Sequence, residues 1–412
     1  MGEQVDARTA AERLGVDVRT LYAYVSRGAL RRVPGPDGRS SRYDSDELEL
    51  LAHRSRPRTL PRPAASIDLV IATRVSTVAD GVVRYRGKDA LVLVAAGERF
   101  EAVAGLLWAG PPATESSWRL PAVQAPSLGL VLGTLGGGPV AMRFAAAVAA
   151  VAASGASAGA GSPPDWPAWG RFLIATLVEA SGQAREDADG PVARRLWQRW
   201  SPLSPTVARV RALDTALVLL AEHELAASTL AVRVAASARA APPGCVLAGL
   251  GALSGTLHGD APRIVRERIL RPRAGDSADG GEAGADPRLP AGVGFGHPVH
   301  RHGDPRTGPL LSAVHAIATP ADRDLIERAR RGAPAPPNVD FALGALSHVA
   351  RMPSEAATAI FAVARTAGWI AHAAEEYAEP YVRFRGRAVT PYDGSRARAD
   401  PVSPPGERSG PR

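Results

Sequence analysis

The stretch from residue 120 to residue 250 constrains the fold of this chain more than any other part of the sequence. It is a succession of alanine-, leucine- and valine-rich segments, interrupted by glycine, serine and proline at residues 133–139 and 154–164. Alanine has the highest helix propensity and lets helices pack closely. Hydrophobic residues make up 45% of the chain and aromatic residues only 5%, so a large core must be built mostly from small side chains. We therefore expect a mainly α protein.

Length and cysteine content narrow the class of protein further. The 412 residues suffice for two domains, or for one large domain with a small appendage. The single cysteine, Cys245, excludes a disulfide framework and a cysteine-based zinc site, and its apolar neighbours predict a buried thiol. The N-terminal sequence lacks a signal-peptide pattern, and apolar runs such as residues 144–151 are too short to span a bilayer. We expect a cytoplasmic protein.

The formal net charge of +8 comes mostly from arginine and leaves two interpretations open. One is a solvated basic surface without a dedicated partner. The other is a set of anionic partners: DNA for the N-terminal segment, and phosphorylated or carboxylated ligands for the rest of the chain.

Residues 1–53 have the pattern of a small module. Helices are predicted over residues 7–14, 18–26 and 47–53, with Asp17 as the N-cap of the second and a hairpin-like loop over residues 31–38. This is the order of elements in a winged helix-turn-helix. Residues 9–24, together with the pair Arg42–Tyr43, resemble the MerR/excisionase type.

That resemblance implies that the second helix enters the major groove of DNA. The side chains expected to be exposed for this contact are Arg19, Thr20, Tyr22 and Tyr24, and those expected to meet phosphates in the wing are Arg31, Arg32, Arg39 and Arg42. The alternative is a module that keeps the fold but serves docking or dimerisation. One copy makes few phosphate contacts, so useful affinity for DNA requires a dimer.

The rest of the chain divides by composition. Residues 54–65 form a proline- and arginine-rich linker, and residues 67–94 alternate in a strand-like way around the hairpin signal Asp80–Gly81. A helix with Phe100 and Trp108 in the core is expected over residues 100–110. The main domain is expected to span residues 66–391. Three further segments have low-complexity or glycine-rich sequences: a connector at 136–138, a flexible insert at 273–286 and a disordered tail at 392–412.

Three short motifs in the second half place two histidines and an aspartate in a fixed order. They are residues 253–259 with His258, residues 294–299 with His297, and residues 337–341 with Asp340. One carboxylate and two imidazoles suit carbanion chemistry next to a carbonyl. One group removes a proton, one stabilises the enolate and one polarises the electrophile. In this order the motifs resemble the citrate synthase family, over residues 67–391.

The resemblance implies an all-α fold with a large and a small domain, a short β-hairpin near its start, and an obligate homodimer. It implies condensation of oxaloacetate with acetyl-CoA to citrate, or with propionyl-CoA to 2-methylcitrate, without a metal or other cofactor. In these roles Asp340 removes the methyl proton, His258 stabilises the enolate and His297 protonates the new alkoxide. Oxaloacetate carries two carboxylates and a ketone, so it needs several guanidinium groups and a donor. The implied substrate-binding residues are His223, on a helix, and Arg306, Arg365 and Arg383.

Several details remain open at this stage. Arg383 is expected to act across the dimer interface, but Arg385 and Arg387 compete for that role. The spacing of His297, His300 and His302 also suits a metal, although the family uses none, so we expect His300, His302 and His372 to be structural. Departures from the family pattern are Asp260 after the first histidine motif, His300 where tyrosine is common, and Ala226 where many members have asparagine.

Asp260 is expected either to raise the pKa of His258 or to alter the approach of CoA. The rival to an enzyme is a transcription regulator that senses oxaloacetate or acyl-CoA with this domain and binds DNA with the N-terminal module.

Overall fold

The computed structural model describes most of the chain and divides it into two compact units, Met1–Ala72 and Thr73–Arg412. The described residues are 4–14, 16–26, 30–35, 40–45, 47–48, 69–79, 81–110, 118–135, 138–154, 164–182, 189–270, 293–297, 299–300, 302–331, 333, 335–380 and 382–384. Five predicted features lie wholly or mostly outside them: the helix at 47–53, the linker 54–65, the connector 136–138, the insert 273–286 and the tail 392–412. Arg39, Arg385 and Arg387 also lie outside the described residues.

The N-terminal unit combines two helices with a small antiparallel sheet. Its elements are β1 (Gln4–Asp6), α1 (Ala7–Leu14), α2 (Val18–Ser26), β2 (Val33–Pro34) and β3 (Ser41–Asp44), with strand order β1-β3-β2. Both predicted helices are confirmed, and the carboxylate of Asp17 accepts a hydrogen bond from the Thr20 amide at 2.6 Å. Leu21 and Tyr43 are fully buried in the core of this unit. Strand β1 was not expected from the sequence.

The side chains proposed for DNA contact differ in exposure. Arg19 and Tyr22 are exposed on α2, as expected. Thr20 and Tyr24 are partly buried, and Tyr24 packs against the core of the unit, so the expectation that all four are exposed was wrong for these two. Arg42, on the central strand β3, is partly buried as well.

The second unit, called the body below, is mainly helical, which confirms the predicted fold class. It begins with the antiparallel strands β4 (Ser76–Ala79), β5 (Val82–Tyr85) and β6 (Lys88–Asp89). Its helices are α4 (Ala90–Ala96), α5 (Phe100–Leu107), a 3-10 turn η2 (Ala122–Gln124), α6 (Ala125–Leu135), α7 (Val140–Ala153), α8 (Trp166–Glu179), α9 (Val192–Trp200), α10 (Val207–Leu220), α11 (Ala227–Ser237), α12 (Pro242–Leu253), α13 (Ala261–Ile264), a π-helical turn η3 (Val265–Ile269), α14 (Thr307–Ile317), α15 (Pro320–Arg331), α16 (Val339–Val349) and α17 (Glu355–Tyr377).

The hairpin predicted around residues 80–81 is confirmed by the pairing of β4 with β5, in which Val78 lies opposite Val83. The strand-like reading of residues 90–94 was wrong, because these residues begin α4. The carboxylate of Asp89 caps this helix by accepting a hydrogen bond from the Leu91 amide at 2.7 Å. A good N-cap here outweighs the apolar alternation of the sequence.

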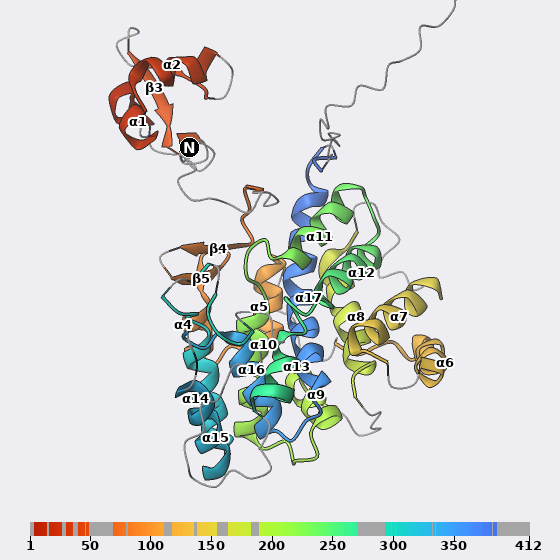
Figure 1. Ribbon diagram of the computed structural model, residues 1–412. Coiled ribbons are helices and arrows are strands. Elements are labelled where there is room, and N and C mark those ends of the chain that lie inside the picture. The colour runs from red at the N-terminus through yellow and green to blue at the C-terminus, as the bar shows by residue number, and fades with distance from the viewer. Residues whose placement is uncertain are drawn as a thin grey trace, which may run out of the picture. The chain divides into compact units, whose positions relative to one another are not determined.

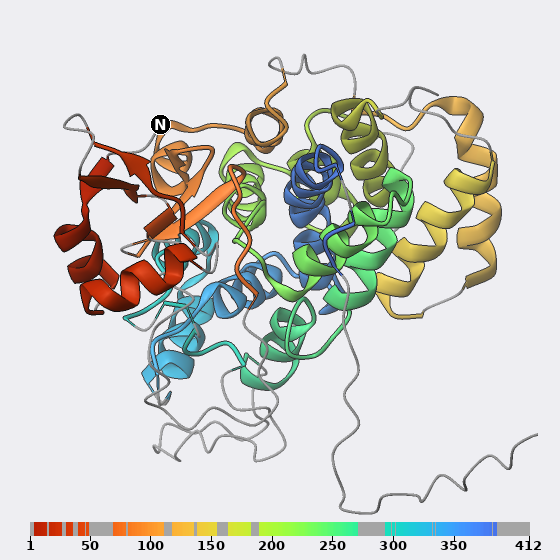
Figure 2. The ribbon, with the colours of Figure 1, turned by 90° about the horizontal axis from the view of Figure 1, so that it is seen from above.

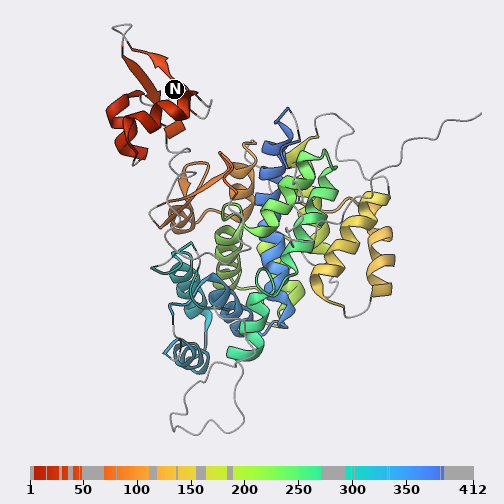
Figure 3. The same ribbon diagram turned by 45° about the horizontal axis from the view of Figure 1, so that its top comes forward.

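Helix α17 is the central element of the body. Nearly all of its side chains are buried, and these include the polar side chains of Arg365, His372 and Glu376. It packs against α5, α7, α8, α10, α11, α12 and α16. In Figures 1, 2 and 3, α17 (blue) runs through the middle of the body, with α14 and α15 at one end and α6 and α7 at the other. Phe100, Trp108 and Cys245 lie in the surrounding core, as predicted.

Within the described part of the chain, no helix combines the length and the apolar character needed to cross a membrane.

Candidate active site

His223 lies in the loop between α10 and α11, and not on a helix as expected. Helix α10 ends at Leu220 because its last carbonyl groups find other partners. The hydroxyl of Tyr85 lies 3.0 to 3.2 Å from the carbonyl oxygens of residues 218, 219 and 222. The amide of Gly368 in α17 donates to the carbonyl of Ala221 at 3.1 Å. Glu224 has a φ of 53°, in the left-handed region, and turns the chain directly after His223.

His297 and Asp340 are held together by one asparagine. The side-chain oxygen of Asn338 caps α16 by accepting from the amides of Asp340 and Phe341, at 3.0 and 3.3 Å. Its side-chain nitrogen donates to the carbonyl of Gly296 at 2.9 Å, and its amide donates to the carbonyl of Gly294 at 3.0 Å. The loop that carries His297 is therefore fixed to the first turn of the helix that carries Asp340.

Three imidazoles form a cluster next to this junction. The ring centroids of His223, His297 and His300 are 4.8 to 5.1 Å apart, and the Nε2 atoms of His223 and His300 are 2.9 Å apart. The Nδ1 atom of His297 accepts from the amides of Val299 and His300, at 3.1 and 3.3 Å. The proton of the neutral His297 ring therefore lies on Nε2. No group of three or more His, Cys, Asp or Glu side chains is suited to hold a metal ion in the described part of the chain.

Two buried guanidinium groups lie near the cluster. Arg306 is 2% exposed and donates through Nε and Nη2 to Asp304, at 2.9 and 2.8 Å. Arg365 is 1% exposed, donates through Nε to the carbonyl of Leu220 at 2.9 Å, and lies over the ring of Phe361. Among the described residues, Nη1 of Arg306 and both terminal nitrogens of Arg365 have no hydrogen-bond partner. Buried cations with unused donors favour the binding of an anion.

His258 lies in the turn after α12, where its ring meets the edge of Phe361. Its Nε2 atom is 2.7 Å from the hydroxyl of Ser228, and that hydroxyl accepts the indole N–H of Trp369 at 3.2 Å. The hydroxyl is thus free to donate to Nε2 of His258, an arrangement that leaves the proton of the neutral ring on Nδ1.

The carboxylate of Asp260 does not act on His258. It accepts two hydrogen bonds from Arg263, at 2.8 and 2.6 Å, and a third from Thr358 at 3.0 Å. Burial, assisted by the charge of Arg365, lowers the pKa of His258 to about 4. The expectation that Asp260 raises this pKa was wrong, because Arg263 neutralises the carboxylate.

The pKa of one carboxyl group is raised, whereas the pKa values of the imidazoles are lowered. Burial raises the pKa of Asp340 to about 7; Asp304 adds to the rise, whereas Arg306 and Arg365 oppose it. Burial and then Arg306 lower the pKa of His297 to about 4. At neutral pH the imidazoles are therefore uncharged, and the carboxyl group of Asp340 is poised between its two forms.

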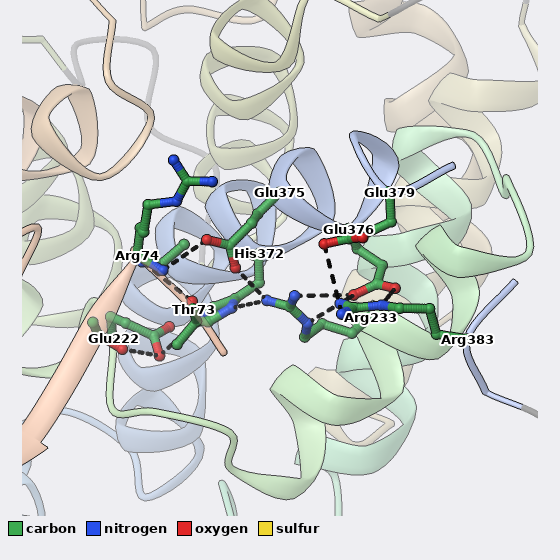
Figure 4. A network of polar contacts seen from close by, with 11 residues as sticks. Thr73, Arg74, Glu222, Arg233, His372, Glu375, Glu376, Glu379 and Arg383 are labelled. Carbon is green, nitrogen blue, oxygen red and sulfur yellow. Dashed lines mark hydrogen bonds and ion pairs between the residues drawn. The ribbon is translucent and has the colours of Figure 1, made fainter. Parts of the chain in front are cut away.

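A buried polar network lies behind the His223 loop (Figure 4). Glu222 accepts from Nε2 of His372 at 3.1 Å and from the hydroxyl of Ser76 at 3.2 Å. Arg233 donates to Nδ1 of His372 at 2.8 Å, which places the proton of this histidine on Nε2. The ring of His372 is therefore a structural link, as expected, between a buried arginine and a buried glutamate.

The other side of Arg233 faces two carboxylates at the end of α17. It donates to Glu375 at 2.7 Å and to Glu376 at 3.0 Å. Arg383 also donates to Glu376, through Nε at 2.9 Å, so its guanidinium lies in this network within its own chain (Figure 4). The charge of Arg365 acts on His223, His258 and Asp340.

The sequence model of one family, described as citrate synthase, C-terminal domain, matches residues 68–385. This chain belongs to the citrate synthase family.

Two curated members of the citrate synthase family match part of this chain in sequence. The chain is 34% identical over 177 residues to citrate synthase of Mycolicibacterium smegmatis, a match that covers 41% of this chain and 47% of the relative. It is 33% identical over 181 residues to 2-methylcitrate synthase 2 of Corynebacterium glutamicum, which covers 41% and 46%. The chain thus spans about half the length of the curated relatives it matches.

Solved citrate synthases share the fold. The Thermoplasma acidophilum enzyme, in a ternary complex with carboxymethyl coenzyme A and oxaloacetate, matches with a TM-score of 0.58 and 23% identity, over 83% of this chain and 96% of the other. The Pyrobaculum aerophilum enzyme matches with a TM-score of 0.61 and 23% identity, over 79% and 91%.

Sequence reasoning missed part of the site in this citrate synthase-family body. His300 was expected to be structural, and its hydrogen bond to His223 was not predicted; its position three residues after His297 in one turn was the available signal. Ser228 and Asn338 were not singled out either. Their roles depend on hydrogen bonds to distant loops, which the local sequence does not reveal.

Proposed function

We propose that this chain condenses oxaloacetate with acetyl-CoA or propionyl-CoA and releases free CoA, without a metal or other cofactor. The observation that carries the proposal is the pair of buried guanidinium groups with unused donors, placed beside neutral imidazoles and a carboxyl group with a pKa near 7. A small dicarboxylate with a ketone satisfies these donors. The names of the relatives and the ligands of the Thermoplasma complex point to the same chemistry.

The proposed roles follow from the protonation states. Arg306 and Arg365 bind the carboxylates of oxaloacetate, and His223 lies near its carbonyl. Asp340, as the carboxylate, removes a methyl proton from the thioester while Nδ1–H of His258 donates to the thioester oxygen. The enol carbon then bonds to the ketone carbon, and Nε2–H of His297 protonates the new alkoxide. Water hydrolyses the resulting acyl-CoA, which yields the tricarboxylate and CoA.

A thiol-release assay tests this function. Purified full-length protein is mixed with oxaloacetate and acetyl-CoA or propionyl-CoA, beside the Asp340→Asn variant. We expect turnover in the wild type and a loss of at least about a hundredfold in the variant, because a proton-transfer group is removed. A folded wild type that binds oxaloacetate but releases no thiol contradicts the proposal and favours a sensor.

The proposal leaves two acyl substrates, acetyl-CoA and propionyl-CoA, to be distinguished by experiment. Acetyl- and propionyl-CoA differ by one methylene, which an apolar pocket discriminates by only about 1–3 kcal/mol. Relatives of both kinds match this chain. The ratio of kcat/KM for the two thioesters in the same assay identifies the preferred substrate.

We also propose a homodimer in which Arg383 reaches the partner's substrate. Its support is the resemblance at this arginine; the guanidinium binds Glu376 of its own chain, so this role requires it to exchange that carboxylate for the partner's substrate. Light scattering coupled to gel filtration gives the mass. The Arg383→Ala variant should then raise the KM for oxaloacetate; a monomer with full activity contradicts this assignment.

A second candidate function is DNA binding by the N-terminal unit. The supporting observation is the exposed face of α2, which presents Arg19 and Tyr22, within a unit that also carries the antiparallel strands β2 and β3. We expect a salt-dependent gel shift of promoter fragments that is weakened by Arg19→Ala. Arg8→Ala, an exposed arginine of α1, is the matched control. No shift at low salt would leave a docking or dimerisation role for the unit.

A further inference from the structure

His300 contacts both imidazoles of the proposed oxaloacetate site. Its amide donates to Nδ1 of His297 at 3.3 Å, and its ring nitrogen Nε2 lies 2.9 Å from Nε2 of His223. The His300 side chain is 5% exposed, and that of His223 is 6% exposed. The pair is therefore a buried hydrogen bond between two side chains, and not an accidental surface contact.

The pair of neutral rings requires opposite protonation at the two bonded nitrogens. One Nε2 must carry the proton and donate, and the other must accept with its lone pair. Two arrangements satisfy this condition. In one, His223 donates and its Nδ1 atom is bare; in the other, His300 donates and the proton of His223 lies on Nδ1.

The hydrogen-bonding groups of the proposed substrate distinguish the two arrangements. Among the described residues, Nδ1 of His223 has no hydrogen-bond partner, so this nitrogen is the one left to face a ligand. Oxaloacetate offers only acceptors, a ketone oxygen and carboxylate oxygens. A bare Nδ1 would repel them, whereas Nδ1–H donates to them. The second arrangement is therefore the one that binds substrate.

We propose that His300 is a positioning residue, whose Nε2–H donates to Nε2 of His223 and thereby holds the proton of His223 on Nδ1, toward the bound oxo acid. This inference rests on the proposed function. The same residue acts on His297 through its backbone, which side-chain substitutions leave in place. The centroid of the His300 ring also lies 4.8 Å from that of the His297 ring, so the test compares substitutions that both keep a ring at this position.

A matched pair of variants separates the hydrogen bond from ring size. His300→Tyr and His300→Phe introduce rings of nearly equal size, but only tyrosine keeps a donor. We expect the KM for oxaloacetate to rise roughly tenfold or more in the phenylalanine variant, the usual effect of losing a buried hydrogen bond, and to stay within about threefold in the tyrosine variant. His302→Phe, at an exposed histidine two residues on, is the control and should not change KM.

Oxaloacetate binding is measured by the shift in the thermal unfolding temperature. This measurement distinguishes a failure of the role of His300 from a failure of the proposed function. If wild-type protein binds oxaloacetate and both variants bind it equally well, or both are equally impaired, the role of His300 is overturned. If the wild type neither binds oxaloacetate nor releases thiol, the proposed function fails instead.

A measurement on the unmodified full chain covers the case in which a variant does not fold. In protein labelled with 13C and 15N, the ring nitrogen shifts report the tautomer of each imidazole, and the signals of His223 and His300 are assigned through correlations from each ring to its own backbone. We expect His223 to carry its proton on Nδ1 and His300 on Nε2. The opposite pair of tautomers overturns the inference, whether or not the enzyme is active.

Discussion

The carboxyl group of Asp340 is exceptional among the site residues because it titrates near neutral pH. Its burial disfavours the charged form more than Arg306 and Arg365 favour it, which gives a pKa of about 7. A base with a pKa near the working pH is effective in proton abstraction, since its ionised form is present and still basic.

The pH dependence of kcat/KM should reflect this group. As the pH falls through about 7, Asp340 takes up a proton and can no longer accept one, so we expect kcat/KM to fall roughly tenfold per pH unit. The pKa values of His258 and His297, both about 4, predict no second inflection between about pH 5 and 7. A flat profile down to pH 5 contradicts the assignment of Asp340 as the base.

The same carboxyl group should lower the stability of the fold at high pH. Its pKa is about 7 in the folded protein and 3.8 in the unfolded reference, so the folded state binds the proton more tightly. Stability from this group is full below about pH 4 and is lost as the pH rises through about 7. We expect Asp340→Asn to unfold at a higher temperature than wild type at about pH 8, with a free energy of unfolding larger by on the order of 4 kcal/mol, and to lose this advantage near pH 4.

Helix α17 packs closely against the His223 loop at Gly368. A Cβ atom on Gly368 would lie 2.0 Å from Glu222 Oε2 and 2.6 Å from the carbonyl oxygen of Ala221. We expect Gly368→Ala to destabilise the protein by about 2–4 kcal/mol and to displace the loop, which weakens oxaloacetate binding. Gly251→Ala, in α12 with open space around it, should instead be neutral or stabilising in the same thermal unfolding experiment.

Helix α11 begins without a side-chain cap. Ala226 occupies the N-cap position with extended backbone dihedrals, and no side chain there accepts from the first amides of the helix. We expect Ala226→Asn to raise the free energy of unfolding by about 1 kcal/mol, because the amide oxygen satisfies one of these donors. Ala227→Asn, one residue into the helix, should give no such gain in denaturant unfolding. Equal effects of both substitutions contradict the capping explanation.

The elements also show what the sequence could and could not predict. Local signals indicated a succession of helices in the body and located the hairpin, because both depend on neighbouring residues. The motifs with His258, His297 and Asp340 were found through their order and the family resemblance. Strand β1 was missed, since only its pairing with β3 makes it a strand. The helical assignment of His223 failed for a similar reason: the groups that end α10 come from Tyr85 and Gly368, which lie far away in the sequence.

At the scale of the whole molecule, the two units have separate hydrophobic cores. We expect a chain that begins at Thr73 to retain the main thermal transition of the full-length protein within a few degrees, and to retain thiol release if the proposed function is correct. Any DNA binding should disappear with the same truncation. Loss of the main transition would show that the body needs the N-terminal unit to fold.

Cys245, the one cysteine of the chain, lies on a buried face of α12, and burial raises the pKa of its thiol to about 12. Near pH 8 only about one molecule in ten thousand carries the reactive thiolate, even before the shielding by the core is considered. Chromogenic disulfide reagents should therefore register each CoA set free without a background from the protein itself. After denaturation the same reagents should titrate one thiol per chain. The rate at which the Cys245 thiol reacts therefore measures the rate at which the helical core opens.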